Sequence, residues 1–169
     1  HWPTLDAAAQ WLQQCGVASD DTAFLLRMAG GRPSDALHLA AAGIGTQDWS
    51  TWPRALAQGE PGWIKDAPAP QAIEGLQKLC HDLMATHCGA APRYFSPADL
   101  SGLFSSNQTG AGSRGRPMPD FGALVRWSKD LMALARKAEH PFQAGLMTEF
   151  LVAEAAQAIN SGFRSKTGA

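Results

Sequence analysis

The sequence predicts an all-α protein with a small N-terminal helical domain and a larger C-terminal helical bundle. Apolar residues recur at i, i+3, i+4 and i+7 spacing in most segments, which is the period of an amphipathic helix. Glycine and proline fall between these segments, where helices end and begin. No stretch alternates apolar and polar residues between hairpin turns, so no strand is expected.

Three short helices are expected within residues 1–44. The first ends at Gly16, since glycine commonly follows a helix terminus. The second is expected to start at a cap formed by Ser19–Asp20 and to end at Gly30–Gly31. Pro33 suits the first turn of the third helix, where its missing N–H has no intrahelical partner. This region is therefore predicted to be a compact three-helix unit.

Longer amphipathic segments follow, separated by two stretches rich in glycine and proline. The segments 59–70 and 105–119 are predicted to be loops. Further helices are predicted over the residues that keep one apolar face: 48–56, 71–87, 97–104, 121–140 and 146–159. Ser96 is expected to cap the third of these helices. Together they predict a bundle whose first helix has an uncertain boundary within 45–69.

The helix predicted over 71–87 has the clearest division into two faces. Its apolar face carries Ile73, Leu76, Cys80, Leu83 and Met84. Its opposite, polar face carries Glu74, Gln77, Lys78 and Asp82. The pattern predicts that the second set faces water. Trp49, Trp52 and Trp63 lie close together before this helix, and we expect them in the core rather than at an interface.

Composition excludes several classes of function. The chain has 169 residues with 45% apolar and 17% charged residues and a net charge of −1, so no overall basic field favours nucleic acid or an acidic membrane. No apolar run reaches the ~20 residues needed to cross a bilayer. The chain opens at His1 without a methionine, which suggests a fragment or a processed product. Three scattered cysteines predict reduced thiols in the cytoplasm.

Two motifs invite a ligand, and neither has the context that its chemistry needs. The GAGSRG segment (110–115) matches a dinucleotide fingerprint but lacks the preceding strand and is followed by prolines. The CHDLMATHC segment (80–88) suggests zinc, yet its two cysteines lie about 12 Å apart on a straight helix. Neither a GxSxG elbow nor a Walker sequence is present. We therefore expect no catalytic, cofactor-binding or metal-binding residues.

Three segments resemble one known family. LLRMAGGRPSDALHLA (25–40) is similar to the sensor-2 region of AAA+ clamp-loader proteins. LQKLCHDLMATHCGAAPRYF (76–95) resembles the collar-domain helix of the delta prime subunits of bacterial DNA polymerase III. MTEFLVAEAAQAI (147–159) is similar to the last helix of that family. The three matches occur in the family's order and span most of the chain, whereas residues 46–69 match poorly.

The resemblance implies a domain order and a function. Residues 1–44 would be the lid, residues 45–69 a linker or first collar helix, and residues 70–169 the collar. Collars pack into a ring, so the implied partners are the delta and tau/gamma subunits, with DNA reached only through the assembled complex. The implied role is a non-hydrolysing subunit that supports clamp loading during DNA replication in the cytoplasm. The fragment would not itself be an enzyme, although the parent complex is a DNA-directed DNA polymerase, a nucleotidyltransferase.

Ser34 occupies the position at which the resemblance would place a residue that contacts nucleotide phosphates. In hydrolysing relatives, an arginine one residue before Asp-Ala-Leu reaches the nucleotide phosphates, and the match on Asp35 places Ser34 there. Arg32 is displaced by two residues and separated by Pro33. Without a guanidinium at Ser34, no bidentate phosphate contact is expected. The alternatives are an ATP-hydrolysing tau/gamma-type fragment, an unrelated helical protein-interaction domain, or a helical enzyme or metal protein using residues 80–88.

Overall fold

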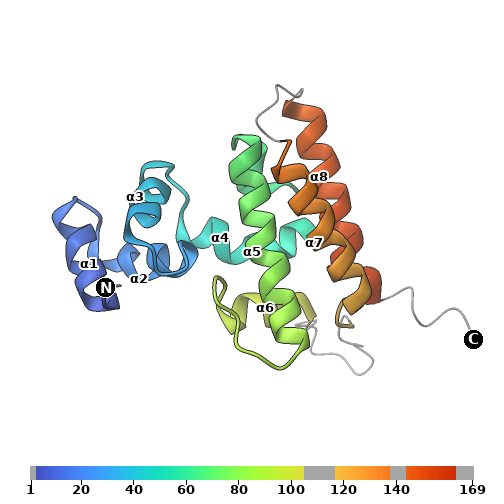
Figure 1. The fold of residues 1–169 in the computed structure, drawn as a ribbon, viewed down its shortest axis with the longest axis horizontal. Coiled ribbons are helices and arrows are strands. Elements are labelled where there is room, and N and C mark those ends of the chain that lie inside the picture. Colours follow the sequence, from blue (N-terminus) through green and yellow to red (C-terminus); the bar gives the residue numbers. More distant parts are fainter. Residues whose placement is uncertain (1–2, 105–116, 138–143, 163–169) are drawn as a thin grey trace, which may run out of the picture.

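A computed structural model describes residues 3–104, 117–137 and 144–162. Within these ranges the chain forms α helices and short 3-10 segments and contains no strand, which confirms the all-α prediction. The elements are α1 (Leu5–Gln14), α2 (Ser19–Met28), α3 (Pro33–Ala41), α4 (Thr46–Ala57), η1 (Gly62–Lys65), α5 (Ala69–His87), α6 (Pro97–Phe104), α7 (Phe121–Ala135) and α8 (Ala144–Ile159). Figure 1 shows α1–α3 gathered at one end of the molecule and α5, α7 and α8 side by side at the other.

Helices α1–α3 form a unit with its own small core, which we call the N-terminal unit. The core is built from small and aliphatic side chains of all three helices: Ala8, Leu12, Leu25, Leu26, Ala29 and Ala36. The Thr4 hydroxyl caps α1 by accepting the N–H of Ala7 at 3.3 Å. The cap predicted at Ser19–Asp20 is wrong by one residue, because Ala18 is the N-cap of α2 and makes no side-chain bond.

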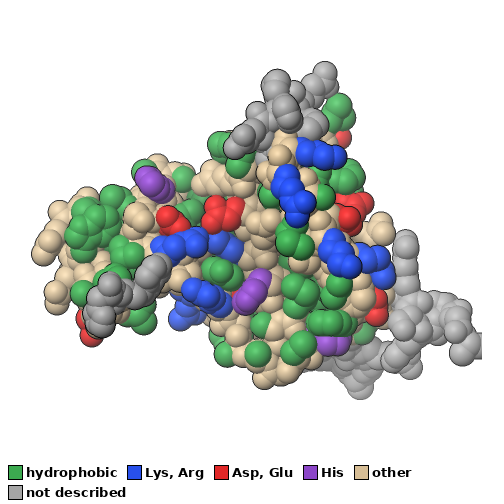
Figure 2. Space-filling model, in the orientation of Figure 1, with side chains coloured by type: hydrophobic (Ala, Val, Ile, Leu, Met, Phe, Trp, Pro, Cys, Tyr) green, Lys and Arg blue, Asp and Glu red, His purple; other side chains and the backbone are tan. Residues whose placement is uncertain are grey.

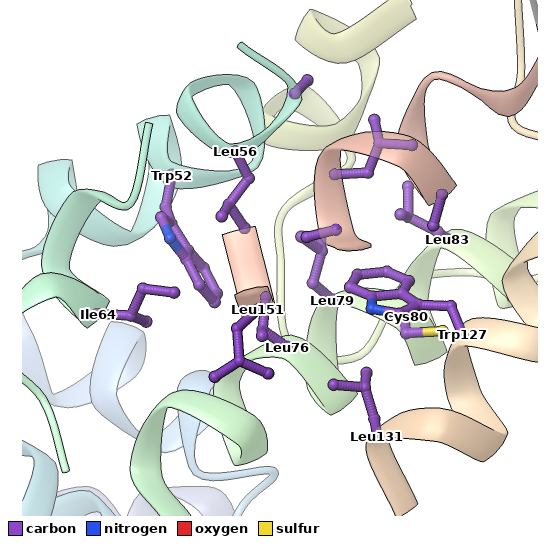
Figure 3. Packing of buried hydrophobic residues seen from close by; sticks show 14 of the residues in the cluster. Trp52, Leu56, Ile64, Leu76, Leu79, Cys80, Leu83, Trp127, Leu131 and Leu151 are labelled. Atoms are coloured by element: carbon purple, nitrogen blue, oxygen red, sulfur yellow. The ribbon is translucent and has the colours of Figure 1, made fainter. Parts of the chain in front are cut away.

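Helices α4–α8 and η1 form the larger part, which we call the C-terminal bundle. Helix α5 packs against α7 and α8, and α4 packs against α6 and α8. Figure 3 shows aliphatic side chains of α4, α5 and α8 meeting Trp52 on one side and Trp127 on the other. Leu56, Leu76, Leu79 and Leu83 are all fully buried there. Burial of this apolar surface is the main favourable term holding the bundle together.

An aromatic cluster lies at the end of the C-terminal bundle that contains α4. Trp49 stacks on Phe95 with ring centroids 4.5 Å apart, and the Trp52 and Trp63 centroids lie 4.9 Å apart. Trp52 Nε1 donates to the Pro61 carbonyl at 2.9 Å, so this indole is buried without losing its hydrogen bond. Trp49 and Trp52 are buried in the core, which confirms that prediction for both of them.

Two predicted boundaries differ from the structure. The segment 59–70 is not a plain loop: it contains η1, which buries Ile64, and α5 already begins at Ala69. A single turn of 3-10 helix is too short to show an apolar period, so the sequence pattern did not reveal it. Helix α7 ends at Ala135 instead of near residue 140, and the Lys137 N–H closes a turn on the Leu134 carbonyl.

The prediction that Lys78 and Asp82 face water is wrong. Lys78 is 7% exposed and Asp82 is fully buried. The Lys78 ammonium lies 2.9 Å from Glu74 Oε1, one turn earlier on α5. Asp82 is buried because the chain after α5 folds back over this side of the helix and donates backbone hydrogen bonds to its carboxylate. Helix α5 is therefore covered on two sides. Only one of them is marked in the sequence by apolar residues at helical spacing.

Candidate functional site

Residues 32–35 lie where the N-terminal unit meets α5. Ser34 is exposed in the first turn of α3. Arg32 is the N-cap residue of α3, and its guanidinium bonds to the Asp35 carboxylate. A guanidinium nitrogen of Arg32 also lies 3.8 Å from Glu74 Oε1 on α5. Arg32 thus belongs to an ion cluster that links the two parts of the molecule.

Figure 2 shows basic and acidic side chains side by side at this junction. The ion cluster consists of Arg32, Asp35, Glu74 and Lys78. These residues also line a groove of about 590 Å³ between α3 and α5. Each basic group already has a carboxylate partner, so the cluster offers little unpaired positive charge to an anionic ligand. The two pairs of Arg32 are about half exposed, and such pairs each contribute about 0–1 kcal/mol to stability, whereas Lys78 is buried.

The CHDLMATHC residues point in different directions from α5. Cys80 is buried and its thiol donates to the Leu124 carbonyl at 3.4 Å, whereas Cys88 is exposed at the end of the helix. His81 Nδ1 lies 2.9 Å from Asp82 Oδ1. The His87 ring packs against Phe121 with centroids 5.1 Å apart. Among the residues that the structure describes, no three His, Cys, Asp or Glu side chains are grouped to hold a metal. The GAGSRG segment lies outside the described residues.

Burial of Cys80 predicts a loss of stability at alkaline pH. Desolvation raises the pKa of this thiol to about 12, whereas an unfolded thiol ionises near about 8.5. Above that pH the unfolded state releases a proton that the folded state keeps, so stability falls as pH rises. Between pH 7.5 and 10, the free energy of unfolding of wild type should fall by about 2 kcal/mol more than that of Cys80→Ser. Urea unfolding at the two pH values measures both changes. An equal loss in both proteins would contradict a buried, protonated thiol.

Asp82 is the most connected side chain of α5, and sequence reasoning missed it. Its Oδ1 accepts the N–H of Arg93 at 2.9 Å, and its Oδ2 accepts those of Tyr94 at 2.7 Å and Phe95 at 2.8 Å. These three consecutive N–H groups fix the segment after α5 against the helix. No periodic signal marked it, because Asp82 lies on the polar face of the predicted helix, opposite Cys80. His81 Nδ1 also lies 2.9 Å from Oδ1, so the carboxylate contacts an imidazole as well as three backbone N–H groups.

Helix α8 carries an apolar face that nothing covers in the described part of the chain. Its inner face is buried in the bundle through Leu151, Val152, Ala155, Ala158 and Ile159. On the outer face, Leu146 is 63% exposed and Phe150 is 47% exposed. These residues are four positions apart and lie on one side of the helix, with Ala153 exposed on the next turn. We call Leu146, Phe150 and Ala153 the outer face of α8.

A shallow groove borders the outer face of α8. It has a volume of about 300 Å³ and is lined by Gly59, Pro61, Thr148, Glu149, Val152 and Ala153. Other large exposed apolar residues are Leu5 and Trp11 on α1 and Phe121 and Met132 on α7. The residues of each of these pairs are further apart in sequence than Leu146 and Phe150, which are neighbours on adjacent turns of one helix. A helix that is apolar on two sides is usually covered on both, so the outer face of α8 is the strongest candidate for a binding surface.

The chain matches no family model, no curated protein and no solved structure. None of the helices in the described ranges is both long enough and apolar enough to cross a bilayer.

Proposed function

We propose that this chain is the lid and collar region of a non-hydrolysing clamp-loader subunit of the delta prime type. In this role it binds the delta and tau/gamma subunits through its collar in the cytoplasm and reaches DNA only as part of that assembly. The observation that carries the proposal is the outer face of α8, which is apolar although the inner face of the same helix already fills the core. The order of the three family-like segments supports the same assignment.

The chemistry of the outer face fits a protein helix. Full burial of a leucine or phenylalanine side chain contributes about 1.5–3 kcal/mol, and both residues here are already partly covered. Burial of Leu146 and Phe150 in an interface therefore supplies a central apolar contact. Glu149 is exposed beside them, so it favours a partner whose polar side chains surround the apolar contact. An apolar helix of a neighbouring collar meets these requirements.

Residues near the start of α3 favour a non-hydrolysing subunit over the tau/gamma type. Ser34 carries a short neutral hydroxyl, which cannot form the forked, charged contact that a guanidinium makes with phosphate. Arg32 is held by the carboxylate of Asp35, and Glu74 lies close to it. Recruiting Arg32 to a nucleotide would break this pairing. The segment supports a role in building the complex rather than in ATP turnover.

Assembly with purified collars tests the proposal. The chain is mixed with the collar regions of delta and tau/gamma, and the molar mass of each eluted species is measured by light scattering after size exclusion. We expect this chain to co-elute with at least one of the two partners. Separate elution from both at micromolar concentration would overturn the assignment. Co-elution that persists with an unrelated helical bundle in place of the collars would equally count against it.

Charge placed on the outer face of α8 is expected to weaken this assembly strongly. In the double variant Leu146→Glu and Phe150→Glu, burial of two carboxylates without partners costs far more than the lost apolar contact. We expect affinity for the partner collars to fall by roughly 100-fold, measured by sedimentation velocity.

The matched control is the double variant Leu5→Glu and Trp11→Glu. It removes the same kind of exposed apolar surface and adds the same charge on α1. Both double variants should keep the thermal midpoint of wild type within a few degrees, because all four side chains are exposed. An equal fall in affinity in the two double variants would show that net charge is responsible, and the outer face of α8 would lose its assigned role.

A further inference from the structure

The N-terminal unit and the C-terminal bundle meet over a small apolar contact. Met28 of α2 is buried in the core of the bundle, and Phe24 and Leu39 pack against that core from the N-terminal unit. The chain joins the two parts through the short connection 42–45 between α3 and α4. A contact of this size leaves the orientation of the N-terminal unit dependent on additional groups.

Arg93 provides the most direct polar link between the two parts. Its guanidinium donates to the Gly30 carbonyl at 2.8 Å, joining the end of α2 to the segment that follows α5. The same guanidinium lies over the Tyr94 ring, 5.6 Å from its centroid. Gly30 has a φ of +64°, and a Cβ there would lie 3.0 Å from Tyr94 Cε1. The Tyr94 ring is thus packed against the backbone of the turn that Arg93 binds.

Asp82 holds Arg93 and Tyr94 in position. Three consecutive N–H groups, of Arg93, Tyr94 and Phe95, all point at its carboxylate. These bonds fix the backbone on α5, and from there the side chains of Arg93 and Tyr94 reach Gly30 of the N-terminal unit. Phe95 is buried on the other side, stacked on Trp49. One carboxylate inside α5 therefore supports both residues that contact Gly30.

The ion cluster adds a second link beside the first. Arg32, at the start of α3, lies near Glu74 of α5, which also pairs with Lys78. The Lys78 ammonium lies 5.8 Å from the centroid of the Tyr94 ring, on the same side of α5. Arg32 and Glu74 are about half exposed, so water screens this pair. The contact at Gly30 has better geometry and should contribute more to the fixed orientation.

We propose that residues 93–95, anchored by Asp82, form a clasp that fixes the orientation of the N-terminal unit on the C-terminal bundle. When Arg93 releases the Gly30 carbonyl, the N-terminal unit turns about the connection 42–45 while both parts stay folded. The clasp is a conformational device of the chain itself, and it holds whether or not the proposed function is correct.

The native cysteines allow a direct test. Cys15 lies in the N-terminal unit and Cys88 in the C-terminal bundle, and both are exposed, whereas Cys80 is buried. Nitroxide labels on the two exposed thiols report the distance between the two parts by pulsed electron paramagnetic resonance. Wild type is expected to give one narrow distance distribution. In the double variant Arg93→Ala and Tyr94→Ala, the width is expected to increase about twofold or more.

Two further variants make the test decisive. Arg54→Ala removes an exposed arginine from α4 and should keep the narrow distribution. Asp82→Asn keeps the side-chain shape, and should widen the distribution because a neutral amide has only one acceptor oxygen for three N–H groups. This second variant decides the outcome if the double variant fails to fold.

Local motion of the label near the clasp is measured separately. With Cys15→Ser, the spectral line shape of the label on Cys88 reports only its own mobility. A wider distance distribution with an unchanged line shape supports the clasp. An unchanged width in the folded variants, or a widening matched by faster motion of the Cys88 label, would overturn it.

Discussion

Replacement of Asp82 by alanine is expected to lower the free energy of unfolding by about 3–5 kcal/mol. The carboxylate accepts three backbone N–H groups and is fully buried. Alanine would leave those donors without partners while Phe95 remains packed in the core, and each unsatisfied buried group costs about 1–3 kcal/mol. Urea unfolding followed by tryptophan fluorescence measures the change.

Asp48 provides a matched control for Asp82. Its exposed carboxylate accepts a single N–H, from Gly45 at 3.4 Å, near the start of α4. Asp48→Ala should therefore cost about 1 kcal/mol or less. Asp82→Asn should fall between the two alanine variants. A cost for Asp82→Ala equal to that of Asp48→Ala would contradict the anchoring role of the buried carboxylate.

Replacement of Trp52 by alanine is expected to cost about 3–5 kcal/mol. The indole is 1% exposed, packs against both Trp49 and Trp63, and donates to the Pro61 carbonyl. Its neighbourhood has little freedom to collapse, because α5 approaches so closely at Gly75 that a Cβ there would lie 3.1 Å from the Trp52 ring. A large cavity and an unpaired carbonyl would both remain. Guanidinium unfolding followed by circular dichroism measures the cost.

Trp11 allows the same substitution on the surface. It is 41% exposed on α1, so Trp11→Ala removes an indole of the same size with little loss of packing. We expect a cost below about 1 kcal/mol. Costs of similar size for Trp11→Ala and Trp52→Ala would mean that the aromatic cluster is not a rigid part of the core.

The helices were predictable because local spacing carries most of the information. Glycines, prolines and the Ser96 cap marked their ends, and the Ser96 hydroxyl does accept the Asp99 N–H at 3.2 Å. The burial of Lys78 and Asp82 was not predictable in the same way. The donors to Asp82 come from residues 11 to 13 positions later in the chain. Such contacts depend on how the chain folds back, and they leave no periodic pattern within α5.

The candidate binding surface was only half visible in the sequence. Spacing predicted a helix over 146–159 with one apolar face, and the single face is wrong because the apolar residues of α8 lie on two faces. Packing against α4, α5 and α7 separates the two by burying Leu151 and Ala155 and leaving Leu146 and Phe150 outside. The link from Arg93 to Gly30 was also hidden, because it joins backbone and side chain 63 residues apart.

Photo-crosslinking from position 150 tests the central claim most directly. Phe150 is replaced by the photoreactive residue benzoylphenylalanine, and the chain is irradiated in the presence of the delta and tau/gamma collars. The proposed function predicts crosslinks from this position to a helix of a neighbouring collar, identified by mass spectrometry, and far fewer from the same residue placed at Trp11. Absence of crosslinks at position 150, or equal yields at both positions, would contradict the assignment of the outer face of α8 as the subunit interface.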